Sequence, residues 1–260
     1  MTAAADATHL RANHPLVRGG LADPRTALHV GTTPSPPAEV STSSSAVPVI
    51  PAFNDVAQGL PVHAYAKGDL LYRADAPAAA LFYLEAGLVA LELNTPKPRI
   101  GALAGPGDVV GALTPGSGGY LESAVALSGE VAVRVLDERA QAELPAAELA
   151  ALIARAAGAR LTALTQALED GEHPVPARVA RAFLRLGSRF GQSLADGTVR
   201  LTLPVTHDTL AAMVGAARET TTAVVADLRR LGLLEGTRGS YRMRPAELTE
   251  YALEATLDAR

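Results

Sequence analysis

Hydrophobic side chains recur every three or four residues on both sides of Gly215. Before the glycine they are Leu210, Ala211 and Val214, and after it they are Val224, Val225, Leu228 and Leu231. This spacing gives each segment one apolar face of an α-helix. A glycine between two helices allows one helix to stop and the next to begin at a steep angle. The pattern therefore predicts a helix-turn-helix.

The opposite face of the second helix is polar at its start. Its first turns display Arg218, Glu219, Thr221 and Thr222. An arginine can donate to guanine, a glutamate can accept from cytosine, and a threonine can contact a thymine methyl group. We expect this helix to enter the major groove of double-stranded DNA.

Residues 51–143 carry a different pattern, in which short alternating or apolar runs are separated by glycine and proline. Short strands at this spacing are typical of an all-β sandwich or jelly roll. The candidate strands are Val62 to Tyr65, Leu70 to Arg73, Leu81 to Glu85, Leu88 to Leu93, Arg99 to Leu103 and Glu130 to Leu136.

A long helical pattern follows over residues 144–171. Its apolar stripe comprises Leu149, Leu152, Ile153, Ala156, Ala157, Leu161, Leu164 and Leu168. A helix that joins two domains needs a partner for such a stripe. A second copy of the helix and the β domain of the same chain are both suitable partners. We expect a homodimer through residues 144–170, with the β domain sharing the surface.

The remaining residues, 172–260, predict a winged helix-turn-helix domain. The helical pattern breaks between Gly171 and Pro176 and resumes from Ala177 to Leu186. We then expect a glycine-rich loop at 187–197, a strand at Val199 to Leu203, a hairpin wing at 232–243 and a last helix at 245–257. The fold class is thus α+β, with a β jelly roll, a long helix and a C-terminal winged helix-turn-helix.

Residues 1–50 mix Ala, Thr, Ser and Pro without sustained periodicity. Such a segment has too little apolar content to form a core, so we expect a disordered N-terminal arm. A passive extension, a misassigned start codon and a regulatory tail all fit this composition.

Charge is divided unevenly along the chain, whose formal net charge is −4. Residues 51–170 hold 8 Lys and Arg against 14 Asp and Glu, whereas residues 174–244 hold 11 Arg against 5 acidic residues. The basic segment contains the helix-turn-helix, as expected for a DNA-binding domain. A solvated basic face is the alternative that charge alone leaves open.

Several classes of protein are excluded or disfavoured by composition. The absence of cysteine excludes disulfides, thiolate-held zinc, iron-sulfur clusters and a cysteine nucleophile. No apolar run is long enough to span a membrane, and the N-terminus lacks a secretory signal pattern. We therefore expect a cytoplasmic protein that has no membrane partner, and we expect neither a cofactor nor a metal.

The order of these parts, together with the segments 176–181 and 205–215 and the Arg218-Glu219-Thr220 sequence, resembles the cyclic-AMP receptor protein/FNR family of bacterial transcription regulators. The resemblance covers about residues 55–245 and implies a homodimer on a near-palindromic DNA site. It also implies that Arg218 reads guanine and Glu219 reads cytosine. The full set of implied DNA contacts is Thr206, Ala217, Arg218, Glu219, Thr220, Thr221, Thr222 and Val175.

The roles within this set differ. Thr206, Thr220 and the backbone amide of Val175 match phosphate contacts of the family. A second base-reading arginine of the family is replaced by Ala223. This replacement implies an altered half-site, in which Thr221 or Thr222 reads a neighbouring base.

The effector pocket implied by the resemblance is degenerate. The family uses a Gly-Glu pair for the ribose and an Arg-Ser pair for the cyclic phosphate, but this chain has Gly111-Ala112 and Glu122-Ser123. A glutamate repels a phosphate. Ala163 and Leu164 replace a Thr-Ser pair on the long helix, although a small register error would bring Thr162 or Thr165 into the pocket. We therefore expect no conventional cyclic-AMP binding.

Two alternatives complete the sequence interpretation. The same fold could serve as a ligand-gated sensor for another nucleotide or for haem. A metal-dependent cupin-like enzyme is disfavoured because His63 is the only histidine between residues 30 and 172. We expect no catalytic residues and no enzyme activity, and the resemblance implies RNA polymerase as a partner near residues 190–193.

Overall fold

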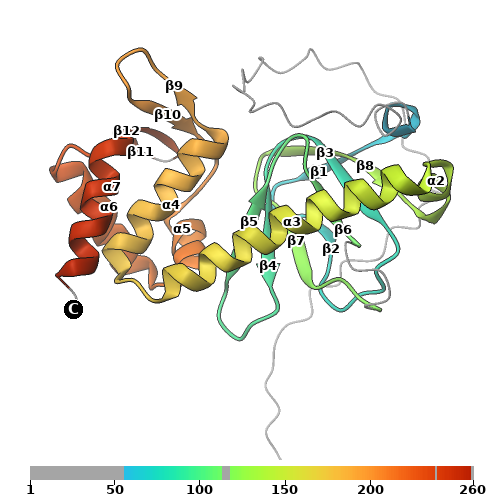
Figure 1. Ribbon diagram of the computed structural model, residues 1–260, viewed down its shortest axis with the longest axis horizontal. Coiled ribbons are helices and arrows are strands. Elements are labelled where there is room, and N and C mark those ends of the chain that lie inside the picture. Colours follow the sequence, from blue (N-terminus) through green and yellow to red (C-terminus); the bar gives the residue numbers. More distant parts are fainter. Residues whose placement is uncertain (1–55, 113–117, 238, 259–260) are drawn as a thin grey trace, which may run out of the picture. The chain divides into compact units, whose positions relative to one another are not determined.

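The computed structural model describes residues 56–112, 118–237 and 239–258 (Figure 1). The arm expected at residues 1–50 lies outside this part of the chain. Within it, a helical segment at residues 56–59 comes first, and the strands, a long helix and a helix-turn-helix domain follow. The expected fold class is confirmed. None of the helices in these ranges is both long and apolar enough to cross a bilayer.

Two four-stranded antiparallel sheets form the β domain. One has the order β1-β8-β3-β6 and the other has the order β2-β7-β4-β5. The strands are β1 Val62–Ala66, β2 Leu70–Tyr72, β3 Leu81–Ala86, β4 Val89–Leu93, β5 Ile100–Ala104, β6 Val109–Gly111, β7 Glu122–Ala126 and β8 Glu130–Leu136. All six expected strands are present within a residue or two of their expected ends.

Strands β6 and β7 were not expected from the sequence. Strand β6 has only three residues, and β7 begins with a glutamate and a serine. Their strand conformation depends on pairing, because β6 pairs with β3 while β7 lies between β2 and β4. Such long-range partners are invisible in a local pattern of side chains.

The two sheets enclose an apolar core. Leu84, Val89, Ala124 and Val133 are fully buried in it. The ring of Tyr72 stacks on that of Tyr120 at 4.3 Å between centroids. Aromatic stacking and buried aliphatic side chains thus hold the two sheets together.

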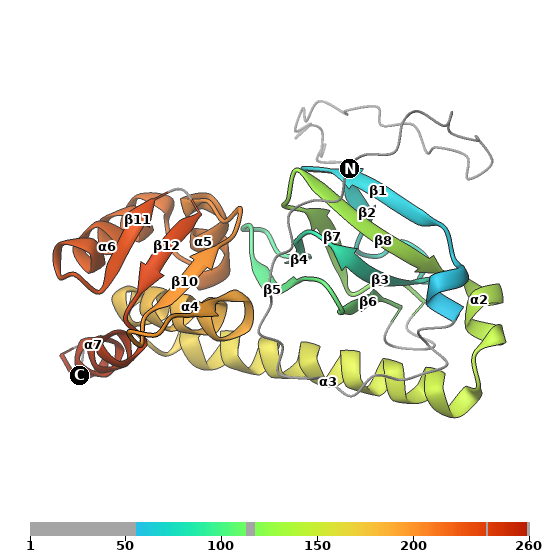
Figure 2. The same ribbon diagram turned by 90° about the horizontal axis from the view of Figure 1, so that it is seen from above.

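Two helices follow the strands. Helix α2, Glu138–Glu143, occupies residues that the sequence assigns to the β domain, and it begins where the Asp137 carboxylate accepts the amide of Ala140 at 2.8 Å. Helix α3, Ala146–Gly171, has Pro145 as its N-cap and buries Leu152 against the β domain. It runs along strands β5 and β6 (Figure 2).

The C-terminal domain consists of four helices and a small sheet of order β11-β12-β10-β9. Its elements are α4 Val175–Phe190, β9 Gln192–Ser193, β10 Val199–Thr202, α5 His207–Val214, α6 Arg218–Arg230, β11 Leu234–Thr237, β12 Ser240–Met243 and α7 Pro245–Leu257. Phe183 and Tyr241 meet edge to face at 5.2 Å in its core. The hairpin β11–β12 is the expected wing.

The loop expected at residues 187–197 was predicted to begin too early, because α4 continues to Phe190. Gly187 lies inside the helix, where a Cβ would overlap the methyl group of Met243. This glycine therefore serves close packing of α4 against β12 and does not end the helix.

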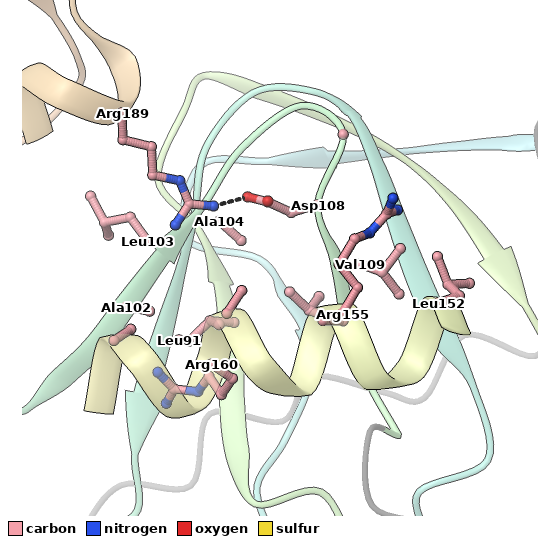
Figure 3. Close-up of a pocket in the computed structure, with 15 residues that line it drawn as sticks. Leu91, Ala102, Leu103, Ala104, Asp108, Val109, Leu152, Arg155, Arg160 and Arg189 are labelled. Atoms are coloured by element: carbon pink, nitrogen blue, oxygen red, sulfur yellow. Dashed lines mark hydrogen bonds and ion pairs between the residues drawn. The ribbon is translucent and has the colours of Figure 1, made fainter. Parts of the chain in front are cut away.

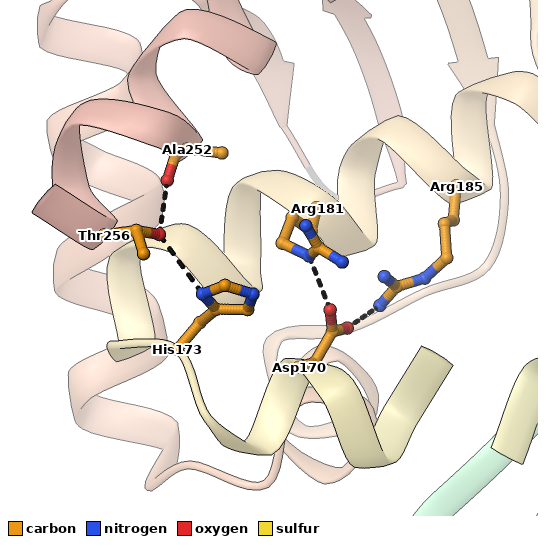
Figure 4. A network of polar contacts seen from close by, with 6 residues as sticks. All are labelled: Asp170, His173, Arg181, Arg185, Ala252 and Thr256. Atoms are coloured by element: carbon orange, nitrogen blue, oxygen red, sulfur yellow. Dashed lines mark hydrogen bonds and ion pairs between the residues drawn. The ribbon is translucent and has the colours of Figure 1, made fainter. Parts of the chain in front are cut away.

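A network of charges joins α3 to α4 (Figure 4). Asp170, 6% exposed at the end of α3, accepts Arg181 Nε at 2.6 Å and also pairs with Arg185. Beyond the break, His173 Nδ1 lies 3.3 Å from the hydroxyl oxygen of Thr256 on α7. These contacts fix the start of the C-terminal domain relative to the end of α3.

Candidate nucleic-acid interface and effector pocket

Both ends of α5 are capped as the sequence predicts. The hydroxyl of Thr206 accepts the amide of Thr209 at 3.1 Å, which satisfies one of the free donors of the first turn. Gly215 ends the helix in the left-handed conformation, with φ of 63°. Arg178 of α4 donates to the carbonyl of Val214 at 2.9 Å. The turn of the helix-turn-helix is thus held by its own caps and by α4.

A second arginine at this turn was not foreseen. A Cβ at Gly215 would overlap the guanidinium group of Arg99, which precedes β5. The left-handed backbone favours glycine at this position. A side chain would in addition require the Arg99 guanidinium group, the end of a flexible side chain, to move aside. No local pattern could have revealed Arg99, because it lies more than a hundred residues away in the sequence.

The start of α6 presents a polar surface. Arg218, Glu219, Thr220 and Thr222 are exposed, as is Ala223. Thr222 follows Arg218 by four residues and Glu219 by three, and residues at both spacings are neighbours on a helix surface. The side chains of Arg218, Glu219 and Thr222 therefore share one face of the helix.

The structure contradicts a base contact by Thr221. This residue is fully buried, and its hydroxyl donates to the carbonyl of Ala217 at 3.0 Å. It precedes Val225 and Leu228 by four and seven residues, so the apolar stripe of α6 includes it. This helical spacing is visible in the sequence, and it indicates that Thr221 lies on the buried face of α6 whereas Thr222 does not.

The first turn of α5 contacts two side chains of this polar surface. His207 Nδ1 lies 2.9 Å from the hydroxyl oxygen of Thr222, and Asp208 pairs with Arg218 Nε at 3.3 Å. Burial and the charges of Arg229 and Arg218 lower the pKa of the His207 imidazole, and Asp208 opposes them. This shift favours the neutral form of the imidazole.

The remaining expected contacts lie at helix starts. Thr206 and Ala217 are the N-caps of α5 and α6, and Val175 is the first residue of α4. Amides in the first turn of a helix have no partner within that helix and can bind phosphate. Thr206, Ala217 and Thr220 are exposed, whereas Val175 is half-buried.

In the implied effector pocket, Glu122 is buried but paired. Its carboxylate accepts Arg160 Nε of α3 at 2.6 Å, and the two side chains are 9% and 10% exposed. Two buried charges that neutralise each other avoid the penalty of a lone buried carboxylate. The partner Arg160 is 38 residues away along the chain, so no local pattern indicates the pair.

The other pocket residues are also engaged within the chain. The hydroxyl of Ser123 accepts the amide of Ala74 at 3.0 Å, and Ala112 donates its amide to the carbonyl of Ala80. The pKa of Tyr72 is raised, first by burial and then by the charge of Glu122, while Arg160 and the backbone of Gly111 oppose the shift. The Tyr72 hydroxyl is buried and has no hydrogen-bond partner among the described residues.

Comparisons with known proteins agree with this geometry. Residues 177–251 match the Crp-like helix-turn-helix domain family. A CRP-like cAMP-activated global transcriptional regulator of Mycobacterium tuberculosis is 29% identical over 175 residues, which are 65% of this chain and 77% of that protein. The chain is a CRP-like transcription regulator.

Two solved structures resemble the regulator over most of their own length. The CRP-family regulator TTHB099 of Thermus thermophilus has a TM-score of 0.60 and 26% identity, covering 75% of this chain and 98% of that one. FixK2 of Bradyrhizobium japonicum has a TM-score of 0.64 and 21% identity, covering 74% and 96%, which shows a shared fold. This is a family of regulators and not of enzymes, as the sequence analysis expects.

Beside the pocket, the regulator has a cavity of about 150 Å³ between its β domain and α3 (Figure 3). Arg155 and Arg160 of α3 line it, together with the ion pair between Asp108 and Arg189. Ala163 lines it too, whereas Thr162 and Thr165 are exposed on another face of α3. In the single chain, therefore, neither threonine hydroxyl lines this cavity.

Proposed function

We propose that this CRP-like regulator binds a near-palindromic DNA site as a homodimer and reads each half-site with α6. The observation that carries the proposal is the shared exposed face of Arg218, Glu219 and Thr222 at the start of that helix. These side chains can address guanine, cytosine and thymine in the major groove. The first-turn amides of α4, α5 and α6 would bind phosphates and set the register.

The surface of α3 supports a homodimer. Exposed residues on one side of this helix follow alternating steps of four and three: Ala147, Ala151, Ala154, Gly158, Leu161, Thr165 and Leu168. This is the spacing of a two-helix seam, and small residues allow two such helices to approach closely. Leu161 and Leu168 are 66% and 75% exposed in the single chain, although leucine favours burial.

A double substitution tests the dimer. Leu161→Glu with Leu168→Glu places two like charges in the seam of each copy, so the variant should sediment as a monomer and lose affinity for a full palindrome. Leu253→Glu with Leu257→Glu on α7 is the control, because these leucines are similarly exposed, at 61% and 66%. A dimeric seam variant would contradict the assignment of the interface to α3.

The DNA-reading role is tested by electrophoretic mobility shift on sites selected from random DNA. Arg218→Ala should weaken specific binding by about 1 to 3 kcal/mol. Arg139→Ala removes an exposed arginine of α2 and should leave binding unchanged. An equal loss for Arg218→Ala on specific and random DNA would show that this arginine contacts phosphate only.

We further propose that conventional cyclic AMP does not gate this regulator. Arg160 already neutralises Glu122 in a buried ion pair, so a cyclic phosphate would have to displace that pair. Calorimetry should show no saturable binding of cyclic AMP at micromolar concentrations. A clear micromolar isotherm would overturn this part of the proposal.

A ligand-gated form of the same regulator is the second candidate, and the cavity beside Arg155, Arg160 and Arg189 favours it. Its volume of about 150 Å³ is smaller than the roughly 300 to 1,000 Å³ of common ligand pockets, which argues against haem and intact nucleotides. Thermal-shift screening with small anions tests for a ligand of this cavity, and the absorption spectrum of the purified protein tests for haem. Together they distinguish a ligand-gated regulator from an ungated one.

RNA polymerase is a proposed partner through residues 190–193, in which Gln192 and Ser193 are exposed. We place the regulator in the cytoplasm, where both partners lie. In a transcription assay with purified polymerase, Gln192→Ala should lower activation without changing DNA affinity, and unchanged activation would remove this contact from the proposal.

A further inference from the structure

Thr222 occupies the centre of the reading surface of α6. It follows Arg218 by four residues and Glu219 by three, so all three side chains lie on one face. Its neighbour Thr221 is buried, and the next exposed position is Ala223, which has no polar group to offer a base. If α6 enters the major groove, as proposed above, Thr222 is the third side chain that meets base edges.

The hydroxyl of Thr222 is held from outside α6. It lies 2.9 Å from His207 Nδ1 in the first turn of α5. The hydroxyl of Thr221 behaves differently, because it donates to a carbonyl of its own helix. Since a hydroxyl both donates and accepts, the bond from Thr222 forms with either tautomer of the neutral imidazole.

This bond fixes the rotamer of Thr222. A threonine carries a hydroxyl and a methyl group on Cβ, and the two occupy different staggered positions. With the hydroxyl directed at α5, the methyl group takes another position on an exposed residue. Because the polar group is already engaged, the methyl group is what Thr222 offers to a base.

We propose that Thr222 reads a thymine through contact between its methyl group and the 5-methyl group of the base, with His207 as the residue that positions it. This inference rests on the proposed DNA-binding function. Burying one methyl group should make the site with thymine bind about fourfold more tightly than the same site with deoxyuridine. Deoxyuridine keeps the base-pairing groups of thymine and lacks only the methyl.

The experiment begins with the best half-site selected from random DNA by the full-length protein. Each thymine of that half-site is replaced singly by deoxyuridine, symmetrically in both halves, and dissociation constants are measured by fluorescence anisotropy. We expect one thymine in each half-site at which the replacement weakens wild-type binding by about fourfold per half-site.

Four variants then assign this methyl sensitivity. Thr222→Ser keeps the hydroxyl and loses the methyl, so the sensitivity should vanish at that thymine. Thr222→Val keeps a methyl and loses the hydroxyl, so the sensitivity should persist. His207→Ala releases the hydroxyl and should reduce the ratio to less than about twofold, and His207→Asn, whose side-chain amide can replace Nδ1, should restore it.

The outcomes separate this inference from the function on which it rests. If the selected site binds specifically but no thymine shows methyl sensitivity, or if the sensitivity survives in Thr222→Ser, the inference is wrong and the regulator still reads DNA. Sensitivity unchanged in His207→Ala would remove the role of His207. Failure to select any specific site would overturn the proposed function together with the inference.

Discussion

Replacing Asp170 by asparagine tests the joint between α3 and α4. The Asp170 side chain is 6% exposed and pairs with Arg181 and Arg185, which both belong to α4. Asparagine has nearly the same shape, but it removes the negative charge and turns one acceptor into an amide donor. Without the charge both ion pairs are lost, and because the new donor would face a guanidinium group, at least one of the two hydrogen bonds is lost as well.

The magnitude follows from the exposure of the three side chains. Breaking a fully buried ion pair costs about 3 to 5 kcal/mol. The two arginines are 34% and 33% exposed, so water can solvate part of the charge left behind. We therefore expect a loss of about 2 to 3 kcal/mol, which is a fall of roughly 4 to 12 °C in Tm for a protein of this size.

Thermal unfolding followed by circular dichroism measures the effect. The matched control is Glu143→Gln, which breaks an exposed pair with Arg139 at 3.5 Å and should change stability by less than about 0.5 kcal/mol. A Tm for Asp170→Asn within about 1 °C of the control would refute the view that this carboxylate holds the joint. A fall in Tm with unchanged DNA affinity would show that Asp170 contributes to stability and not to DNA binding.

Three further predictions concern buried or strained groups. Glu122→Gln should destabilise the protein by about 3 kcal/mol, because it leaves the Arg160 charge buried without a partner. In urea unfolding the double variant Glu122→Leu/Arg160→Met should recover most of that loss, and equal destabilisation by both variants would contradict the ion pair. Gly215→Ala should lower stability by about 1 to 3 kcal/mol, and adding Arg99→Ala should recover only the part caused by overlap, because the positive φ remains strained. The pKa of His207 is lower in the folded state, so its stabilising contribution is present above the unfolded pKa of about 6.5 and is lost as pH falls through the folded value. The Tm of His207→Asn should therefore fall less between about pH 7.5 and pH 5 than the Tm of the wild type. An unchanged slope would show that His207 does not cause the fall in Tm.

Local patterns were sufficient wherever structure depends on neighbours along the chain. The helix-turn-helix follows from apolar spacing around Gly215, whose left-handed conformation only glycine adopts easily. The start of α6 at Arg218 and the wing β11–β12 follow from similar short-range signals. Six of the strands were also found in this way, because alternation and turn residues act over a few positions.

Local patterns failed where a residue depends on a distant partner. Strand β7 forms because β2 and β4 flank it, and its own residues are only weakly apolar. Gly187 suggested a loop, but close packing against Met243 keeps it inside α4. Thr221 and Thr222 look alike in the sequence, and their roles differ because one side of α6 is covered by the domain core.

The sequence by itself determined that this chain carries a helix-turn-helix of the CRP type. The family resemblance further predicts that its pocket lacks the usual ribose and phosphate ligands. Periodicity, capping and motif spacing depend on residues within about one helical turn of each other, and such short-range features can be recognised in the sequence. Only the tertiary structure decided that Arg160 neutralises Glu122, that Arg99 covers Gly215 and that His207 holds Thr222. Those contacts join different elements of the fold, so the side chains meet only after the chain has folded.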